Sequence, residues 1–76
     1  MSIASQDFLI EQRDVDGDWF VLGSAASSPS AVNMMHGYRL LYQYSALRVV
    51  EIRYDELTMT ATREIVVELP PLRRVA

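Results

Sequence analysis

The chain shows a two-residue hydrophobic period in four places and a helical period in one. Residues 7–13 predict a first strand, because apolar and polar side chains fall on alternate faces. One face of this strand carries Phe8, Ile10 and Gln12, and the other face carries Leu9, Glu11 and Arg13. Asp16-Gly17 precedes the apolar run 19–22. Asp-Gly between two β-prone runs predicts a hairpin with a type I′ turn, in which both central residues have positive φ.

A helix is predicted from Ser28 to about Tyr44-Ser45. The Ser28 hydroxyl can accept from the free amides of the first turn, and Pro29 suits the first helical position, where a missing N–H costs nothing. At about 100° per residue, one arc of about 120° predicts the face that packs on the core. This arc holds Ala31, Met34, Met35, Tyr38, Leu41 and Tyr42. Leu40 and Tyr44 form an apolar pair on the opposite face.

Two further strands are predicted, at residues 46–54 and 58–69. In the first of them, alternation places Val50, Ile52 and Tyr54 on one face. In the second, it predicts one face with Ile65, Val67 and Leu69, and the other with Glu64, Val66 and Glu68. Pro70-Pro71 ends the pairing, because neither proline can donate to a ladder.

The order β-β-α-β-β predicts an α+β fold, with a mostly antiparallel four-stranded sheet and one helix on one face. We expect residues 1–76 to form a single small domain, with flexible tails at 1–6 and 70–76. One helix covers only part of one face. Since the run 19–22 is apolar on both faces, we expect the second face to be buried too. In a chain this short, a homodimer is the simplest way to bury it.

The composition excludes several classes of protein. The absence of Cys excludes a disulfide framework and a Cys-based zinc site. All seven basic residues are Arg, and ten acidic residues give a net charge of −3, which argues against binding along a nucleic-acid backbone. No apolar run reaches the roughly 20 residues of a membrane span. Without Cys or an export signal at the N-terminus, a cytoplasmic location is expected.

Candidate chemistry is sparse. Asp14-x-Asp16-x-Asp18 has the first ligands of a calcium loop, but Gly17 stands at the fourth position and Ala25 at the twelfth, where glutamate is needed. A solvated turn is the interpretation, and no metal site is predicted. His36 is the only imidazole, and no nucleophile and orienting acid have a readable spacing around it. No phosphate-binding glycine loop is present, so no catalytic residue and no cofactor are predicted.

Large apolar side chains offer candidates for an interface. Trp19 and Phe20 alternate across their strand, so they form no base-stacking platform, and they are expected to fill the core or an interface. Leu40 and Tyr44 either anchor a partner or a second copy, or are covered by the C-terminal tail through Leu72 and Val75. Both alternatives remain open. The candidate interface residues are Leu40, Tyr44, Trp19 and Phe20.

Several short segments are similar to segments of one group of proteins. They are Phe8-Leu9-Ile10-Glu11, Asp16-Gly17-Asp18-Trp19, Gly23-Ser24, Ser28-Pro29-Ser30-Ala31, Arg48-Val49-Val50-Glu51, and Thr58, Thr60 and Thr62 before Glu64-Ile65-Val66-Val67-Glu68. This succession resembles short hypothetical proteins of tailed phages and prophages, over most of residues 8–68. The shared motifs are structural, so the resemblance implies no activity and no site residue.

Together these features predict a small non-enzymatic interaction or accessory protein that acts as a homodimer. The first alternative is a nucleic-acid-associated protein, in which the contacts are made by Arg48, Arg53, Arg63, Arg73 and Arg74. The second alternative is a small enzyme that uses His36.

Overall fold

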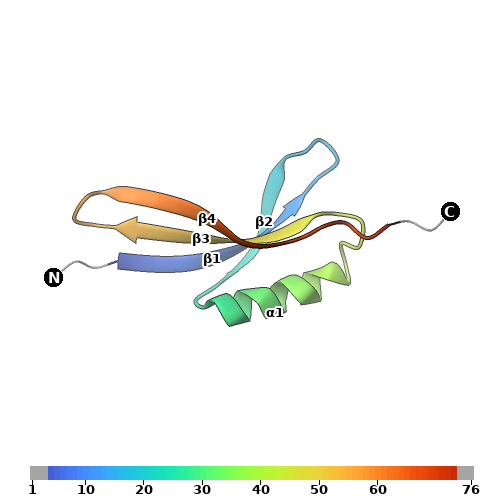
Figure 1. Ribbon diagram of the computed structural model, residues 1–76, viewed down its shortest axis with the longest axis horizontal. Helices are drawn as coiled ribbons and strands as arrows, with labels where there is room; N and C mark the ends of the chain where they lie inside the picture. Colours follow the sequence, from blue (N-terminus) through green and yellow to red (C-terminus); the bar gives the residue numbers. More distant parts are fainter. Residues whose placement is uncertain (1–3, 74–76) are drawn as a thin grey trace.

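The computed structural model describes residues 4–73, which form four strands and one helix (Figure 1). The elements are β1 (Ala4–Arg13), β2 (Trp19–Ala25), α1 (Ser28–Arg39), β3 (Leu47–Asp55) and β4 (Thr60–Leu69). The strands form one sheet in the order β2-β1-β3-β4, and all neighbours are antiparallel. The predicted α+β fold and its β-β-α-β-β order are confirmed.

The core lies between α1 and one face of the sheet. Its buried side chains come from β1, α1 and β3, and they are Phe8, Ile10, Ala31, Met35, Leu47 and Val49. Phe8 and Ile10 lie on the same face of β1, as alternation predicts, and the structure shows that this face points toward the helix. Leu9 and Glu11 therefore lie on the opposite face of the sheet.

The helix differs from its prediction at both ends. Ser27 is the N-cap, since its hydroxyl accepts from the Ser30 amide at 3.3 Å, so the expected cap at Ser28 was wrong by one residue. The helix ends at Arg39, five residues earlier than predicted. Beyond it the chain turns toward β3, and Leu41, expected in the core, is 75% exposed.

The β1–β2 hairpin does not contain the predicted type I′ turn. Gly17 has φ of 89°, but Asp16 does not have the positive φ that such a turn requires. Instead, one oxygen of Asp14 accepts hydrogen bonds from the backbone amides of Asp16 and Asp18, both at 2.9 Å. This side-chain turn needs only one residue in the left-handed region.

A β-bulge in β4 overturns the predicted faces of that strand. Val49 pairs with Val67, but the next residue, Val50, pairs with Ile65, so Val66 is the extra residue. The alternation is therefore shifted by one position. Val67 packs against the core, whereas Ile65, predicted to share its face, lies on the opposite face.

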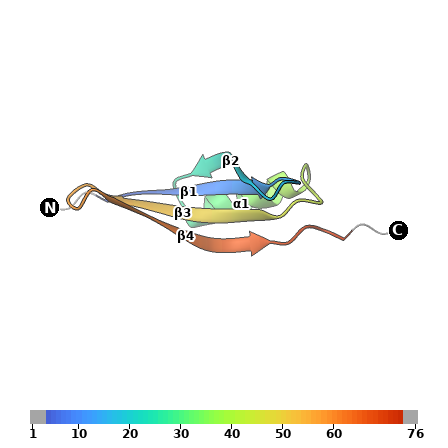
Figure 2. The same cartoon turned by 90° about the horizontal axis from the view of Figure 1, so that it is seen from above.

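The sheet is much longer than the helix. The molecule measures 56 × 25 × 15 Å, while twelve helical residues span about 18 Å. The hairpin of β3 and β4 therefore extends past α1 at one end, and the β1–β2 hairpin turns away from α1 (Figure 1). Seen from above, α1 lies behind the sheet, and no helix of residues 4–73 covers the near face (Figure 2).

Parts of the two segments predicted as flexible tails make backbone hydrogen bonds with the rest of the fold. Residues 4–6 belong to β1 and pair with β3. After β4, the Leu72 amide donates to the Gln43 carbonyl at 2.9 Å. Leu40 nevertheless stays 76% exposed, so these residues do not cover it, and Val75 lies outside the described residues.

Candidate interaction site

The face of the sheet opposite α1, hereafter the uncovered face, is rich in apolar side chains. Alternation and the two bulges, one in β2 and one in β4, determine which side chains it carries. Its large apolar and aromatic members are Leu9, Trp19, Val21, Val50, Ile52, Tyr54 and Ile65. Val21 and Ile65 are exposed, whereas Val50 is buried by its neighbours. All four strands contribute, as expected if this face makes a contact.

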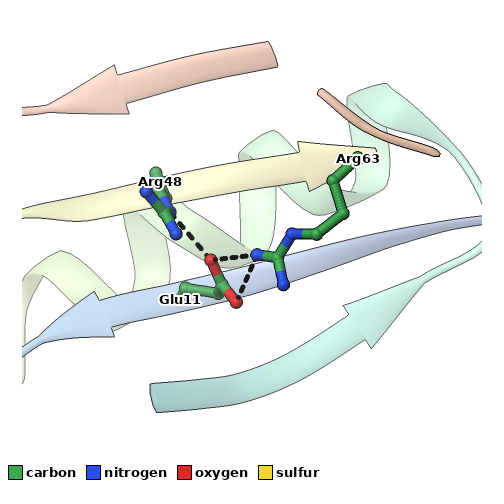
Figure 3. A network of polar contacts seen from close by, with 3 residues as sticks. All are labelled: Glu11, Arg48 and Arg63. Atoms are coloured by element: carbon green, nitrogen blue, oxygen red, sulfur yellow. Dashed lines mark hydrogen bonds and ion pairs between the residues drawn. The ribbon is translucent and has the colours of Figure 1, made fainter. Parts of the chain in front are cut away.

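A cluster of three charged residues occupies the middle of this face (Figure 3). Glu11 is only 3% exposed, and its register partner in β3 is Arg48, whose Nε donates to Glu11 Oε1 at 2.8 Å. Nη2 of Arg63, from β4, donates to both carboxylate oxygens at 3.1 and 3.0 Å. A buried carboxylate is tolerated only when paired and hydrogen-bonded, and these two guanidinium groups meet that need.

Trp19 extends the cluster to β2. The Arg48 guanidinium carbon lies 3.8 Å from the centre of the Trp19 ring, a cation–π contact. β2 and β3 are not neighbours in the sheet, so this contact crosses over β1. The cluster therefore connects side chains from all four strands on the uncovered face.

A pocket of about 360 Å³ opens at this cluster. It is lined by Glu11, Trp19, Arg48, Val50, Arg63, Glu64 and Ile65. The polar groups of the cluster bind one another, and Glu64 also lines the pocket. The lining therefore combines charged residues with the apolar residues Val50 and Ile65.

The charges of the uncovered face cancel. Three acidic side chains (Asp7, Glu11, Glu68) and three arginines (Arg13, Arg48, Arg63) lie on it by strand register. The whole chain carries −3, so the acidic excess lies elsewhere. Two copies of this face can approach each other without net repulsion.

The structure separates the four candidate interface residues. Trp19 lies on the uncovered face, whereas Phe20 pairs with Gln12 and so lies on the helix side, which confirms that the two aromatic residues alternate. Leu40 and Tyr44 are exposed beyond the end of α1, on a different surface. Tyr44 borders a second pocket, of about 260 Å³, together with Val15 and Pro71.

The other candidate residues do not converge. His36 is exposed on α1 and makes none of the hydrogen bonds or ion pairs found in residues 4–73. Arg48 and Arg63 are bound to Glu11, and Arg53 forms an ion pair with Glu51. Arg74 lies outside the described residues. Within residues 4–73, no group of three or more His, Cys, Asp or Glu side chains could hold a metal ion.

The charged cluster was missed in the sequence because its members are far apart: Arg48 follows Glu11 by 37 positions and Arg63 follows it by 52. The one available signal was a carboxylate among apolar residues in β1.

The chain matches no family model, no curated protein and no solved structure. No helix of the described part is long and apolar enough to cross a membrane.

Proposed function

We propose that this chain is a non-enzymatic interaction protein that acts as a homodimer, with its uncovered face packed against the same face of a second copy. The observation that carries the proposal is the uncovered face itself. It combines seven large apolar or aromatic side chains with a net charge of zero. A two-fold symmetric contact requires a surface that is complementary to itself, and such a face meets that condition.

The size of the face supports this proposal. Four strands about 4.8 Å apart, with ten residues in the longest, cover about 600 Å² in projection. A stable dimer buries about 800 Å² of accessible surface per partner, which is of the same order. In such a dimer both helices lie on the outside, and the two sheets form the inner layers.

The side chains supply a driving force and a reason for specificity. Val21 and Ile65 are exposed in the single chain, so their burial favours association. The carboxylate of Glu11 is already paired with Arg48 and Arg63, so contact with a second copy leaves it no unpaired charge. The Trp19 ring adds a large aromatic surface of the kind that is enriched at the centre of interfaces.

The rest of the proposal has support from the sequence alone. The resemblance of residues 8–68 to short phage and prophage proteins favours an accessory role of that origin, and the lack of Cys fits the cytoplasm. Nucleic-acid binding is less well supported, because Arg48 and Arg63 are already bound to Glu11.

Analytical ultracentrifugation of matched variants tests the proposal. Val21→Asp places a charge on the uncovered face, and we expect it to yield monomers that remain folded by circular dichroism. Val15→Asp makes the same change in the exposed hairpin loop, and it should leave the dimer intact. If Val21→Asp associates as well as the wild type, or if Leu40→Ser with Tyr44→Ser abolishes the dimer, the proposed interface is wrong.

A further inference from the structure

The outer edge of β4 is open. The strand lies at one end of the sheet, and within residues 4–73 no other strand pairs with that edge. Residues 60–66 are all exposed. An edge strand presents unpaired backbone N–H and C=O groups, which can pair with another strand.

The sequence of β4 lacks several of the devices that protect such an edge. Thr60–Leu69 contains no proline, glycine or lysine, and Ile65, Val66 and Val67 strongly favour extended structure. The opposite edge, β2, is shorter, contains Gly23 and belongs to the hairpin that turns away from α1. β4 is therefore the edge better suited to accept another strand.

We propose that β4 pairs antiparallel with β4 of a second copy, which joins two sheets edge to edge. The backbone pairing lies at the edge of the sheet, so it does not depend on the function proposed above, although the Arg63 and Glu68 side chains beside it belong to the uncovered face. Its two-fold axis would stand perpendicular to the sheet.

The bulge determines which register is possible. Because Val66 shifts the alternation, Arg63 and Glu68 lie on the same face although they are five residues apart. A register that sets Arg63 opposite Glu68 of the second copy also sets Thr62 opposite Leu69. The two members of each pair lie on the same face of the joined sheet, Arg63 and Glu68 on the uncovered face and Thr62 and Leu69 on the helix side. By symmetry each pair occurs twice.

Charge complementarity favours this register over its neighbours. An axis through Glu64 would set the two Glu64 side chains opposite each other. An axis through Val66 would set Glu64 opposite Glu68, although these two side chains lie on opposite faces of the sheet. Like charges directly opposite are destabilising, whereas an Arg–Glu pair is stabilising. In the proposed register Pro70 falls opposite Ala61, beyond the pairs named above, where a missing N–H does no harm.

Both charged groups are available for this contact. Arg63 is 54% exposed, and it uses only Nη2 to bind Glu11. A guanidinium has five N–H donors, so those on Nε and Nη1 remain for a second carboxylate. Glu68 is exposed and makes no ion pair with the described residues. In an edge-to-edge pair, Arg63 of each copy would bridge its own Glu11 and Glu68 of the other copy.

Cysteine cross-linking tests the register directly, since the natural chain has no Cys. Thr62→Cys and Leu69→Cys proteins, purified separately and then mixed under oxidation, should form a disulfide-linked dimer. Neither variant alone should do so, because the two copies of each position lie several residues apart. Thr62→Cys mixed with Glu64→Cys is the control. No cross-link, or equal yields in the control mixture, would overturn the proposal.

A charge reversal tests the same contact without Leu69. Glu68→Arg sets arginine opposite arginine and should weaken edge association by about tenfold, whereas Glu56→Arg, in the turn before β4, should not change it. With both contacts present, sedimentation should show dimers that form tetramers at higher concentration. If the wild-type protein forms no assembly larger than a dimer, the edge contact is overturned and the proposed function is unaffected. Cross-linking retained in a Val21→Asp background supports the edge contact on its own.

Discussion

The guanidinium of Arg48 stacks on the ring of Trp19, with 3.8 Å between its central carbon and the ring centre. Arg48 also donates to Glu11, so one side chain holds both the aromatic ring and the buried carboxylate. The contact joins two strands that are not neighbours in the sheet. It makes the uncovered face a connected surface and places the chain's only tryptophan on it.

Trp19 should therefore report on association by its fluorescence. In the proposed dimer the ring is shielded from water, so dilution should shift its emission to longer wavelength and increase quenching by acrylamide. The transition should follow the dimer dissociation measured by ultracentrifugation. A spectrum that stays constant while the mass halves would place Trp19 outside the interface.

Glu11→Gln should destabilise the fold more than the loss of either arginine alone. The substitution leaves two guanidinium groups without a counter-charge, and breaking a buried ion pair typically costs about 3 kcal/mol. Arg63 is half exposed, so Arg63→Gln should cost only about 1 kcal/mol. Urea unfolding measures both free energies, and equal costs would contradict the central role of Glu11.

The glycines at 23 and 37 predict opposite effects of the same substitution. A Cβ at Gly23 would lie 2.8 Å from the Tyr38 hydroxyl oxygen, which is held by a hydrogen bond to the Leu22 carbonyl. We expect Gly23→Ala to cost about 2 kcal/mol. At Gly37 nothing lies within 4 Å, so Gly37→Ala in α1 should gain about 1 kcal/mol. Thermal unfolding distinguishes the two, and a stabilising Gly23→Ala would refute the close packing of α1 on β2.

Arg39 should hold the end of α1 and the segment after β4 together. Its guanidinium donates to four backbone carbonyls, those of Tyr42, Gln43, Ser45 and Pro70, at 3.3, 2.8, 3.0 and 2.6 Å. Arg39→Met should lower the free energy of unfolding by about 2 kcal/mol. Arg39→Lys should not restore this stability, because an ammonium cannot span the same acceptors. Hydrogen exchange at the Leu72 amide should accelerate in both variants, and full rescue by lysine would contradict this role.

The elements and their order could be predicted because each depends on local alternation. Phe8 and Ile10 share one face of β1 as their period requires, and the structure places that face on the core. The end of α1 could not be predicted, because the segment from 40 onward has a helical hydrophobic pattern. There the observed turn satisfies its carbonyls through Arg39, whose bond to Pro70 depends on tertiary structure.

The site was harder to predict than the fold. The bulge at Val66 moves Ile65 to the uncovered face, and no residue type in β4 indicates a bulge at this position. Likewise, Glu11 meets Arg48 and Arg63 only because β1 lies beside β3, and β3 beside β4, an order that the sequence pattern does not specify. The apolar character of a second face could be predicted, but its charged centre could not.

The central claim is that the uncovered face of one copy packs on that of another, and isotope-filtered NMR tests it most directly. In a mixture of ¹³C-labelled and unlabelled chains, we predict intermolecular NOEs that involve the methyl groups of Val21 and Ile65 and the ring of Trp19. A monomer at high micromolar concentration would contradict the claim. So would intermolecular NOEs confined to Leu40 and Tyr44.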